Sequence, residues 1–267
     1  MSFQNAFDVG ETRDTAQLRQ LLTTDPVAAA YLLGDLVEPF FGNCRWLVAS
    51  YRGRLEGVVL LYTGLSVPAL LTYGAPDAVE AVLQEFASAL PATCYAKIPL
   101  DHRDFFPRYY RAEHTERLWM MGGRASELTL ADRRHETMRL PPGAALDPIN
   151  ALYADYPGNW FEPSQLGSGL YFGTFADGRL VSIAGTHVLA PAEGVAVLGN
   201  IATASAARRR GYASACTAGL IEGLAALGCE TLALQVAVDN SDAIACYRNM
   251  GFRFREVVLQ SRSSRVS

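Results

Sequence analysis

The stretch Ala206-Ala207-Arg208-Arg209-Arg210-Gly211-Tyr212-Ala213 lies between a predicted strand and a predicted long helix. The first turn of a helix carries backbone N–H groups without partners, and the helix dipole places about half a positive charge there. Gly211 lets a ligand approach the backbone, and three arginines add positive charge suited to phosphate oxygens. The stretch therefore predicts a phosphate-binding helix start. The alternative is a solvated basic helix start that binds nothing.

The segments on both sides of this stretch predict a mixed sheet. Before it, three strands joined through Asp177-Gly178-Arg179 and a Pro/Gly turn read as an antiparallel meander. Apolar residues at three- and four-residue spacing predict the long helix, and Gly228 follows as its C-cap. The predicted elements are strands at 171–176, 180–190 and 195–203, a helix at 207–227, a strand at 231–238, a short helix at 242–250 and a strand at 252–260.

The N-terminal half repeats this order more weakly, and Asp101 precedes Tyr109 by eight residues as Asp239 precedes Tyr247. We therefore expect an internal duplication, with domains at 1–124 and 135–267 and a boundary near 124–134. The fold class is α/β (α+β), with a mixed, mostly antiparallel central sheet flanked by helices. The predicted N-terminal elements are strands at 44–51, 55–64, 69–74, 92–100 and 117–121, a helix at 76–90 and a short irregular helix at 104–110.

Two motifs in the C-terminal half resemble the GNAT superfamily of N-acetyltransferases. Arg208-x-x-Gly211-x-Ala213 is similar to the family's Arg/Gln-x-x-Gly-x-Gly/Ala loop, which opens the helix that binds the pyrophosphate of acyl-CoA. Asp239-Asn240-x-x-Ala243-x-x-x-Tyr247-x-x-x-Gly251-Phe252 is similar to the family's ending. The resemblance covers roughly residues 140–260 and is most specific over 200–252.

The resemblance implies an N-acetyltransferase that uses acetyl-CoA as co-substrate, needs no metal, and transfers an acetyl or similar acyl group to a primary amine in a ternary complex. Backbone groups at 201–203 would pair with the pantetheine arm as another strand does; the alternative is simply a buried strand end. The implied cofactor-binding residues are Asn200, Ile201, Ala202, Thr203, Arg208, Arg209, Arg210, Gly211, Tyr212, Ala213, Asn240 and Tyr247.

The resemblance also implies Tyr247 as a catalytic acid. Amine attack on a thioester gives a tetrahedral intermediate, whose collapse expels a thiolate that needs a proton. A phenol with a pKa of about 10 can supply it to a thiol with a pKa of about 8.5 if the two are adjacent. Ala243, one helical turn before Tyr247, leaves room for the cofactor's arm. The alternative is a tyrosine that packs on the sheet, and Asn240 either bonds the arm or caps its helix.

A base must keep the attacking amine neutral. We assign Glu162, in the segment that frames the acceptor site in this family, while His187 and Asp155 are further candidates. Each also has a structural explanation: a surface carboxylate, a core histidine and a helix-end charge, respectively. Asn200, preceded by Gly199, either orients substrate or bulges its strand. The other histidines are scattered, so no metal site is expected.

The first half lacks the cofactor loop. Thr72-Tyr73-Gly74-Ala75-Pro76-Asp77 has no arginine, and Asp77 would repel a pyrophosphate. It resembles a degenerate GNAT half, and our hypothesis is that it completes the acceptor pocket or buttresses the active half.

Composition and charge exclude several classes of partner and of binding site. The chain has 267 residues, a net charge of −4 and five cysteines without a C-x-x-C pair, which predicts no nucleic-acid partner, disulfide framework or zinc site. Its first residues resemble no signal peptide, and no apolar stretch is long enough for a membrane span, so we expect a cytoplasmic protein without a membrane partner. The expected partner is a small-molecule or peptide amine acceptor, and an edge strand would permit a homodimer.

Two other functions remain open on the sequence. A non-catalytic sensor that binds acyl-CoA needs the same loop but no proton donor. A nucleotide-binding protein needs a phosphate-binding helix start, yet the chain has neither Gly-x-x-x-x-Gly-Lys-Ser/Thr nor Gly-x-Gly-x-x-Gly.

Overall fold

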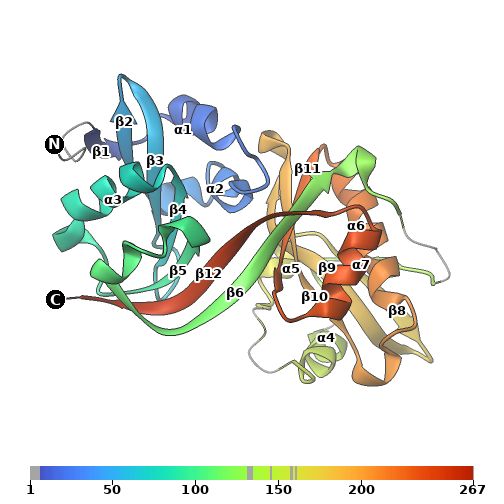
Figure 1. The fold of residues 1–267 in the computed structure, drawn as a ribbon. Helices are drawn as coiled ribbons and strands as arrows, with labels where there is room; N and C mark the ends of the chain where they lie inside the picture. Colours follow the sequence, from blue (N-terminus) through green and yellow to red (C-terminus); the bar gives the residue numbers. More distant parts are fainter. Residues whose placement is uncertain (1–6, 131–134, 145, 157–158, 160, 267) are drawn as a thin grey trace. The chain divides into compact units, whose positions relative to one another are not determined.

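A computed structural model describes residues 7–130, 135–144, 146–156, 159 and 161–266 (Figure 1). The chain forms two compact units. Unit 1 comprises Met1–Met120, Ala237–Asp239 and Arg255–Ser267, and unit 2 comprises Met121–Val236 and Asn240–Phe254. Residues 131–134 of the predicted boundary lie outside the described residues, and the domain ranges 1–124 and 135–267 stay a prediction.

Unit 1 is a sheet with helices packed against it. Its core side chains come from α3 and from both of the neighbouring strands β3 and β4, with Val79 and Val82 of α3 fully buried. The strand order is β1-β2-β3-β4-β5-β12, and among these described strands β4 and β5 are the one parallel pair. The elements are β1 (Asp8–Thr12), α1 (Thr15–Leu22), α2 (Ala30–Gly34), β2 (Cys44–Tyr51), β3 (Arg54–Tyr62), β4 (Ala69–Gly74), α3 (Pro76–Glu85) and β5 (Thr93–Pro99), while β6 (Tyr110–Arg124) and β12 (Arg253–Arg265) run through both units.

Unit 2 has the same plan, with helices on both faces of its sheet. Tyr171 of β8 packs with α4, whereas the next residue, Phe172, points to α6. The strand order is β11-β10-β9-β8-β7, and β10 and β11 pair in parallel. The elements are β7 (Met138–Leu140), α4 (Leu146–Tyr153), α5 (Gln165–Ser168), β8 (Tyr171–Ala176), β9 (Arg179–Ala190), β10 (Val195–Thr203), α6 (Tyr212–Ala226), β11 (Thr231–Ala237) and α7 (Ser241–Asn249).

The predicted fold class is confirmed: a mixed, mostly antiparallel sheet is flanked by helices. Each unit also contains three antiparallel strands, a helix and a strand parallel to the third, as the duplication predicts. In both units the parallel pairing stops early, after Leu71 with Lys97 and after Leu198 with Leu234. Beyond these residues the two strands of each parallel pair are not paired with each other, and the carboxyl ends of parallel strands are a preferred place for ligands.

The long helix α6 begins five residues later than the predicted start at 207. Ser205–Ala207 forms a 3-10 turn, and Arg209 (φ 62°) and Gly211 (φ 89°) adopt left-handed backbone conformations. These residues break the helical path, so the first regular turn starts at Tyr212. In the described part of the chain, no helix combines the length and apolar character that crossing a membrane requires.

Gly57 allows α3 to pack closely on β3. A Cβ at Gly57 would lie 2.8 Å from Ala78 Cβ and 2.9 Å from Val79 N, so backbone would have to move. We expect Gly57→Ala to lower the free energy of unfolding by about 1–3 kcal/mol, the usual cost of overpacking. Gly10→Ala is the matched control, because a Cβ at Gly10 of β1 meets nothing within 4 Å. Urea unfolding checks both variants, and equal stabilities would contradict the packing argument.

Candidate active site

The opening of α6 has backbone N–H groups without acceptors. Gly211 is the N-cap residue, and no side chain caps the helix. Among the described residues, nothing accepts a hydrogen bond from the backbone N–H groups at 209–213. The side chains of Arg208, Arg209 and Arg210 are exposed beside them. His135 packs against this turn, with its ring centre 3.9 Å from that of Tyr212 and its Nε2 2.7 Å from the carbonyl oxygen of Arg210. The arrangement can hold an anion at the helix dipole.

The end of β10 bulges at Asn200. Its φ is 52°, and the register with β9 shifts between Gly199 and Ala202, so the strand-bulge alternative is observed. The N–H of Ala204 donates to the carbonyl of Val181 on β9 at 2.9 Å. Because backbone groups alternate in direction along a strand, those of Ala202 also face β9 and those of Thr203 face away from it. Thr203 therefore presents a backbone donor and acceptor on the side of β10 that faces away from β9.

The hydroxyl of Tyr156 forms hydrogen bonds with both of these backbone groups of Thr203. It donates to the carbonyl oxygen of Thr203 at 2.6 Å and accepts from its N–H at 3.1 Å. The guanidinium of Arg208 lies 5.3 Å from the centre of the Tyr156 ring. Any strand-like ligand that pairs with Thr203 must first displace this hydroxyl.

Tyr156→Phe is therefore expected to tighten coenzyme A binding if the pantetheine arm pairs with Thr203. A net hydrogen bond contributes about 0.5–1.5 kcal/mol, which corresponds to roughly a two- to tenfold change in Kd. Tyr153→Phe is the control three residues earlier, because the Tyr153 hydroxyl donates to the carbonyl oxygen of Asn200 at 2.6 Å and not to Thr203. Calorimetry checks both variants. An unchanged or weaker affinity in Tyr156→Phe would show that the hydroxyl and the arm do not compete.

Asn200 also organises a polar cluster through its side chain. Its Nδ2 donates to Gln165 Oε1 at 3.0 Å and to the Tyr171 hydroxyl at 2.8 Å, and its Oδ1 lies 3.2 Å from His187 Nε2. Gln165 Oε1 also accepts from the backbone N–H of Glu162 at 2.9 Å. The structure thus brings together three of the sequence-predicted residues: His187 contacts the Asn200 side chain directly, and Gln165 links Asn200 to the backbone of Glu162.

The three candidate bases differ in their surroundings. Asp155 Oδ2 accepts from the N–H of Ser205 at 3.1 Å and from its hydroxyl at 3.0 Å, and these hydrogen bonds lower the Asp155 pKa. A carboxylate with a lowered pKa is a weaker base. His187 is exposed on β9, so it is not a core histidine, and Glu162 is exposed as well. Both are accessible to a substrate or to water.

The second half of the predicted site lies on α7. Asn240 is the N-cap of this helix, since its Oδ1 accepts from the N–H of Ala243 at 3.2 Å. Tyr247 is 8% exposed and packs edge-to-face with the Phe252 ring at an interplanar angle of 71°. Burial raises the Tyr247 pKa above its ordinary value, and the neighbouring Cys246 adds to this. The hydroxyl therefore keeps its proton at neutral pH.

A contact between α6 and α7 brings Cys246, the residue before Tyr247, to the first turn of α6. Ser214 Oγ, in the first turn of α6, lies 3.2 Å from Cys246 Sγ, next to Tyr247 in sequence. Figure 1 shows the two helices side by side. Within the described residues no set of three or more His, Cys, Asp or Glu side chains is arranged to hold a metal ion.

Sequence reasoning missed four residues that shape the site: Tyr153, Tyr156, Gln165 and Tyr171. One signal was available for two of them. Tyr153 and Tyr156 are three residues apart in a segment with helical periodicity, which puts both side chains on one face. Gln165 and Tyr171 lie in segments that give no comparable signal, because their role depends on the bulge at Asn200.

Comparison with known proteins gives a consistent result for the fold. Residues 135–252 match the model of the Acetyltransferase (GNAT) family. The comparison with curated protein sequences found no match.

Solved structures with this fold include three informative examples. A putative GNAT-family acetyltransferase from Novosphingobium aromaticivorans is 22% identical, with a TM-score of 0.55, covering 77% of this chain and 91% of its own. A GCN5-related N-acetyltransferase from Kribbella flavida is 17% identical, with a TM-score of 0.61 and coverage of 89% and 94%. A tandem GNAT protein from the clavulanic acid biosynthesis pathway is 11% identical, with a TM-score of 0.56 and coverage of 96% and 98%. At these identities the likeness concerns the fold alone.

Proposed function

Because residues 135–252 match the model of the Acetyltransferase (GNAT) family, we propose that the protein transfers an acetyl or similar acyl group from acyl-CoA to a primary amine. The opening of α6 carries the proposal. Free N–H groups at a helix N-terminus, a glycine N-cap and three exposed arginines together suit the diphosphate of coenzyme A. In this role the diphosphate lies at 208–213, and the pantetheine arm follows the end of β10, beyond the point where its pairing with β11 stops.

The chemistry requires a direct attack of the amine on the thioester carbonyl. The nitrogen forms a bond to the carbonyl carbon, the tetrahedral intermediate collapses, and the C–S bond breaks to release thiolate. Tyr247 gives its proton to that sulfur. Its raised pKa makes it a weaker acid, but the same dry surroundings also disfavour the thiolate, so burial shifts both partners in one direction.

Glu162 acts as the base that removes a proton from the attacking amine, directly or through one water. Its position supports this role, because its backbone is tied to Gln165 and thus to the Asn200 and His187 cluster. An exposed carboxylate also suits a cationic amine, which binds charged and must lose a proton before attack.

Unit 1 is not expected to take the cofactor. Its helix α3 begins with Pro76 and Asp77, so one N–H is missing and a negative charge lies in the first turn. Both features disfavour a diphosphate.

The test is a panel of primary amines offered with acetyl-CoA, with release of free thiol as the signal. We expect at least one amine to give enzyme-dependent thiol release that follows formation of its amide. The absence of amide with every amine, despite tight acetyl-CoA binding, would favour the second function, a non-catalytic acyl-CoA sensor.

A further inference from the structure

Unit 1 contains a pocket of about 360 Å³ at the carboxyl ends of its two parallel strands. Tyr73 and Gly74 from the end of β4 and Pro99 from the end of β5 line it. The pairing of these strands stops at Leu71 with Lys97, before the pocket begins. A crevice where adjacent parallel strands separate is a preferred location for ligands, and the volume suits a small molecule.

The charged side chains of this pocket are mainly carboxylates. They are Asp25, Glu56, Asp101 and Glu256, against the guanidinium groups of Arg54 and Arg255. When all six are ionised, the lining carries a surplus of two negative charges. The adjoining helix α3 adds Asp77 in its first turn. The pocket is therefore electrostatically suited to a cation and unsuited to a phosphate.

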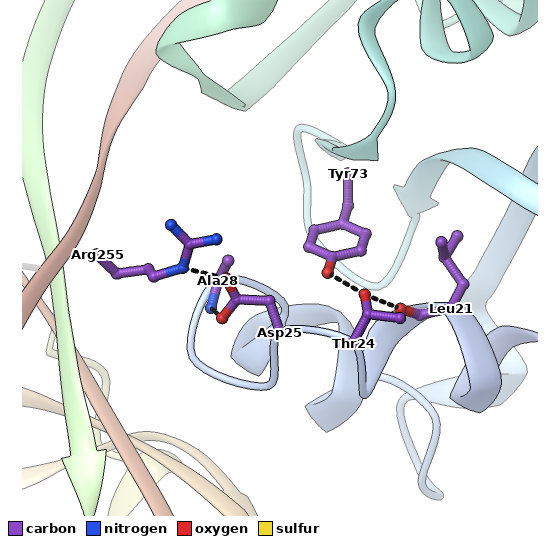
Figure 2. A network of polar contacts seen from close by, with 6 residues as sticks. All are labelled: Leu21, Thr24, Asp25, Ala28, Tyr73 and Arg255. Carbon is purple, nitrogen blue, oxygen red and sulfur yellow. Dashed lines mark hydrogen bonds and ion pairs between the residues drawn. The ribbon is translucent and has the colours of Figure 1, made fainter.

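Only part of this negative charge is neutralised within the chain. Asp25 forms an ion pair with Arg255 and also accepts from the N–H of Ala28 at 3.1 Å (Figure 2). The Glu256 carboxylate makes no hydrogen bond or ion pair with another described residue. Burial raises the Glu256 pKa to about 7, Arg255 acts against this, and Asp25 and Asp101 reinforce it. A partly buried carboxylate without a partner is stabilised by a bound cation.

The remaining walls are fixed and partly aromatic. The Tyr73 hydroxyl lies 3.0 Å from Thr24 Oγ1, which in turn donates to the carbonyl oxygen of Leu21 at 2.7 Å (Figure 2). An aromatic ring attracts an ammonium group. The amide side chains of Gln17 and Gln20 are further lining groups that can bond an N–H.

We propose that this pocket of unit 1 binds a small organic cation, of the diamine or polyamine class, with its ammonium group on the Glu256 carboxylate. Asp101 and Glu56 add to the attraction, while the Asp25–Arg255 pair holds the wall in place. This site does not depend on the acyl-transfer activity of unit 2, since it is formed by other residues and needs no cofactor.

The test is calorimetric titration of the full-length protein with spermidine and with agmatine, without coenzyme A and at low salt. We expect saturable binding of one equivalent, with an affinity about tenfold higher at pH 8 than at pH 6. A cation lowers the pKa of a neighbouring carboxyl, so binding near pH 6.5 releases a proton. The measured heat must then change with the ionisation enthalpy of the buffer.

Two variants examine the pocket, and a third is the control. Glu256→Gln should weaken binding at least tenfold and remove the proton release. Ala28→Lys, which introduces an ammonium at the pocket wall, should also weaken binding at least tenfold. This second variant tests the pocket independently if Glu256→Gln does not fold. Asp104→Asn removes an exposed carboxylate outside the pocket and should leave the Kd within twofold.

Several outcomes overturn the proposal. They are no saturable binding of either amine, binding that survives both pocket variants, and equal weakening in Asp104→Asn. Binding of inorganic pyrophosphate that is lost in Arg54→Ala would show an anion site instead.

Discussion

Gly211→Asp is expected to weaken coenzyme A binding roughly 100-fold or more while leaving the protein folded. Its carboxylate would lie at the helix opening, where the diphosphate is proposed to bind. Two like unit charges about 4 Å apart near a protein surface repel by about 4 kcal/mol at an effective dielectric constant of 20. Aspartate tolerates the left-handed conformation at this position (φ 89°) better than most residues, and a carboxylate at a helix N-terminus is favourable.

Gly228→Asp is a matched control at the other end of α6. Gly228 has φ 91°, and a Cβ there meets nothing within 4 Å. The new carboxylate lies at the negative end of the helix dipole, where it costs about 0.3–1 kcal/mol of stability. We therefore expect Gly228→Asp to have the lower stability of the two variants but to keep its affinity for coenzyme A. Gly211→Asp should have the higher stability but lose the cofactor. Equal affinities, measured by calorimetry, would show that the cofactor does not bind at this helix opening.

Tyr247→Phe is expected to reduce kcat by 10²–10⁴-fold, the usual contribution of a general acid, with the Kd for acetyl-CoA within twofold. The substitution removes the hydroxyl and keeps the ring that packs on Phe252. The Tyr247 pKa is raised, so this group stays protonated as the pH increases through the ordinary range of a tyrosine. Activity should therefore show no alkaline decline caused by Tyr247 below about pH 10.

The control for this variant is Tyr110→Phe in unit 1. Tyr110 is also buried, and its hydroxyl donates to the carbonyl oxygen of Pro91 at 2.8 Å. Losing that bond should cost about 1–2 kcal/mol of stability and leave kcat unchanged. If Tyr247→Phe behaves like Tyr110→Phe, Tyr247 is a packing residue and the proton comes from elsewhere. If the wild-type protein binds acetyl-CoA but acetylates no amine, the result supports the sensor function.

The regular part of the fold was predictable from the sequence because local patterns determine it. Alternating and continuous apolar runs located β8 to β11, and Gly228 and Asn240 marked helix ends that the structure confirms. The start of α6 was placed too early, since a 3-10 turn and a left-handed arginine interrupt the helix without changing the apolar spacing. Periodicity alone does not report such an interruption.

The candidate site was only partly predictable. The cofactor loop is a contiguous segment, so its residues can be recognised in order. The partners of Asn200 come from α5, β8 and β9, and they meet at the bulged end of β10 only in the folded chain. The Tyr156 hydroxyl bonds the backbone of Thr203, which is 47 residues away in the chain. A contact from a side chain to distant backbone leaves no pattern in the sequence from which it could be predicted. The pocket of unit 1 likewise combines α1, β4, η4 (Leu100–His102) and β12, which are distant in sequence.

The most direct measurement of the central claim is calorimetric titration of the full-length protein with coenzyme A. We expect saturable binding of one equivalent per chain, lost in Gly211→Asp and retained in Gly228→Asp. Heat of binding that is absent for both coenzyme A and acetyl-CoA, or that persists in Gly211→Asp, would contradict the assignment of the α6 opening as the diphosphate site.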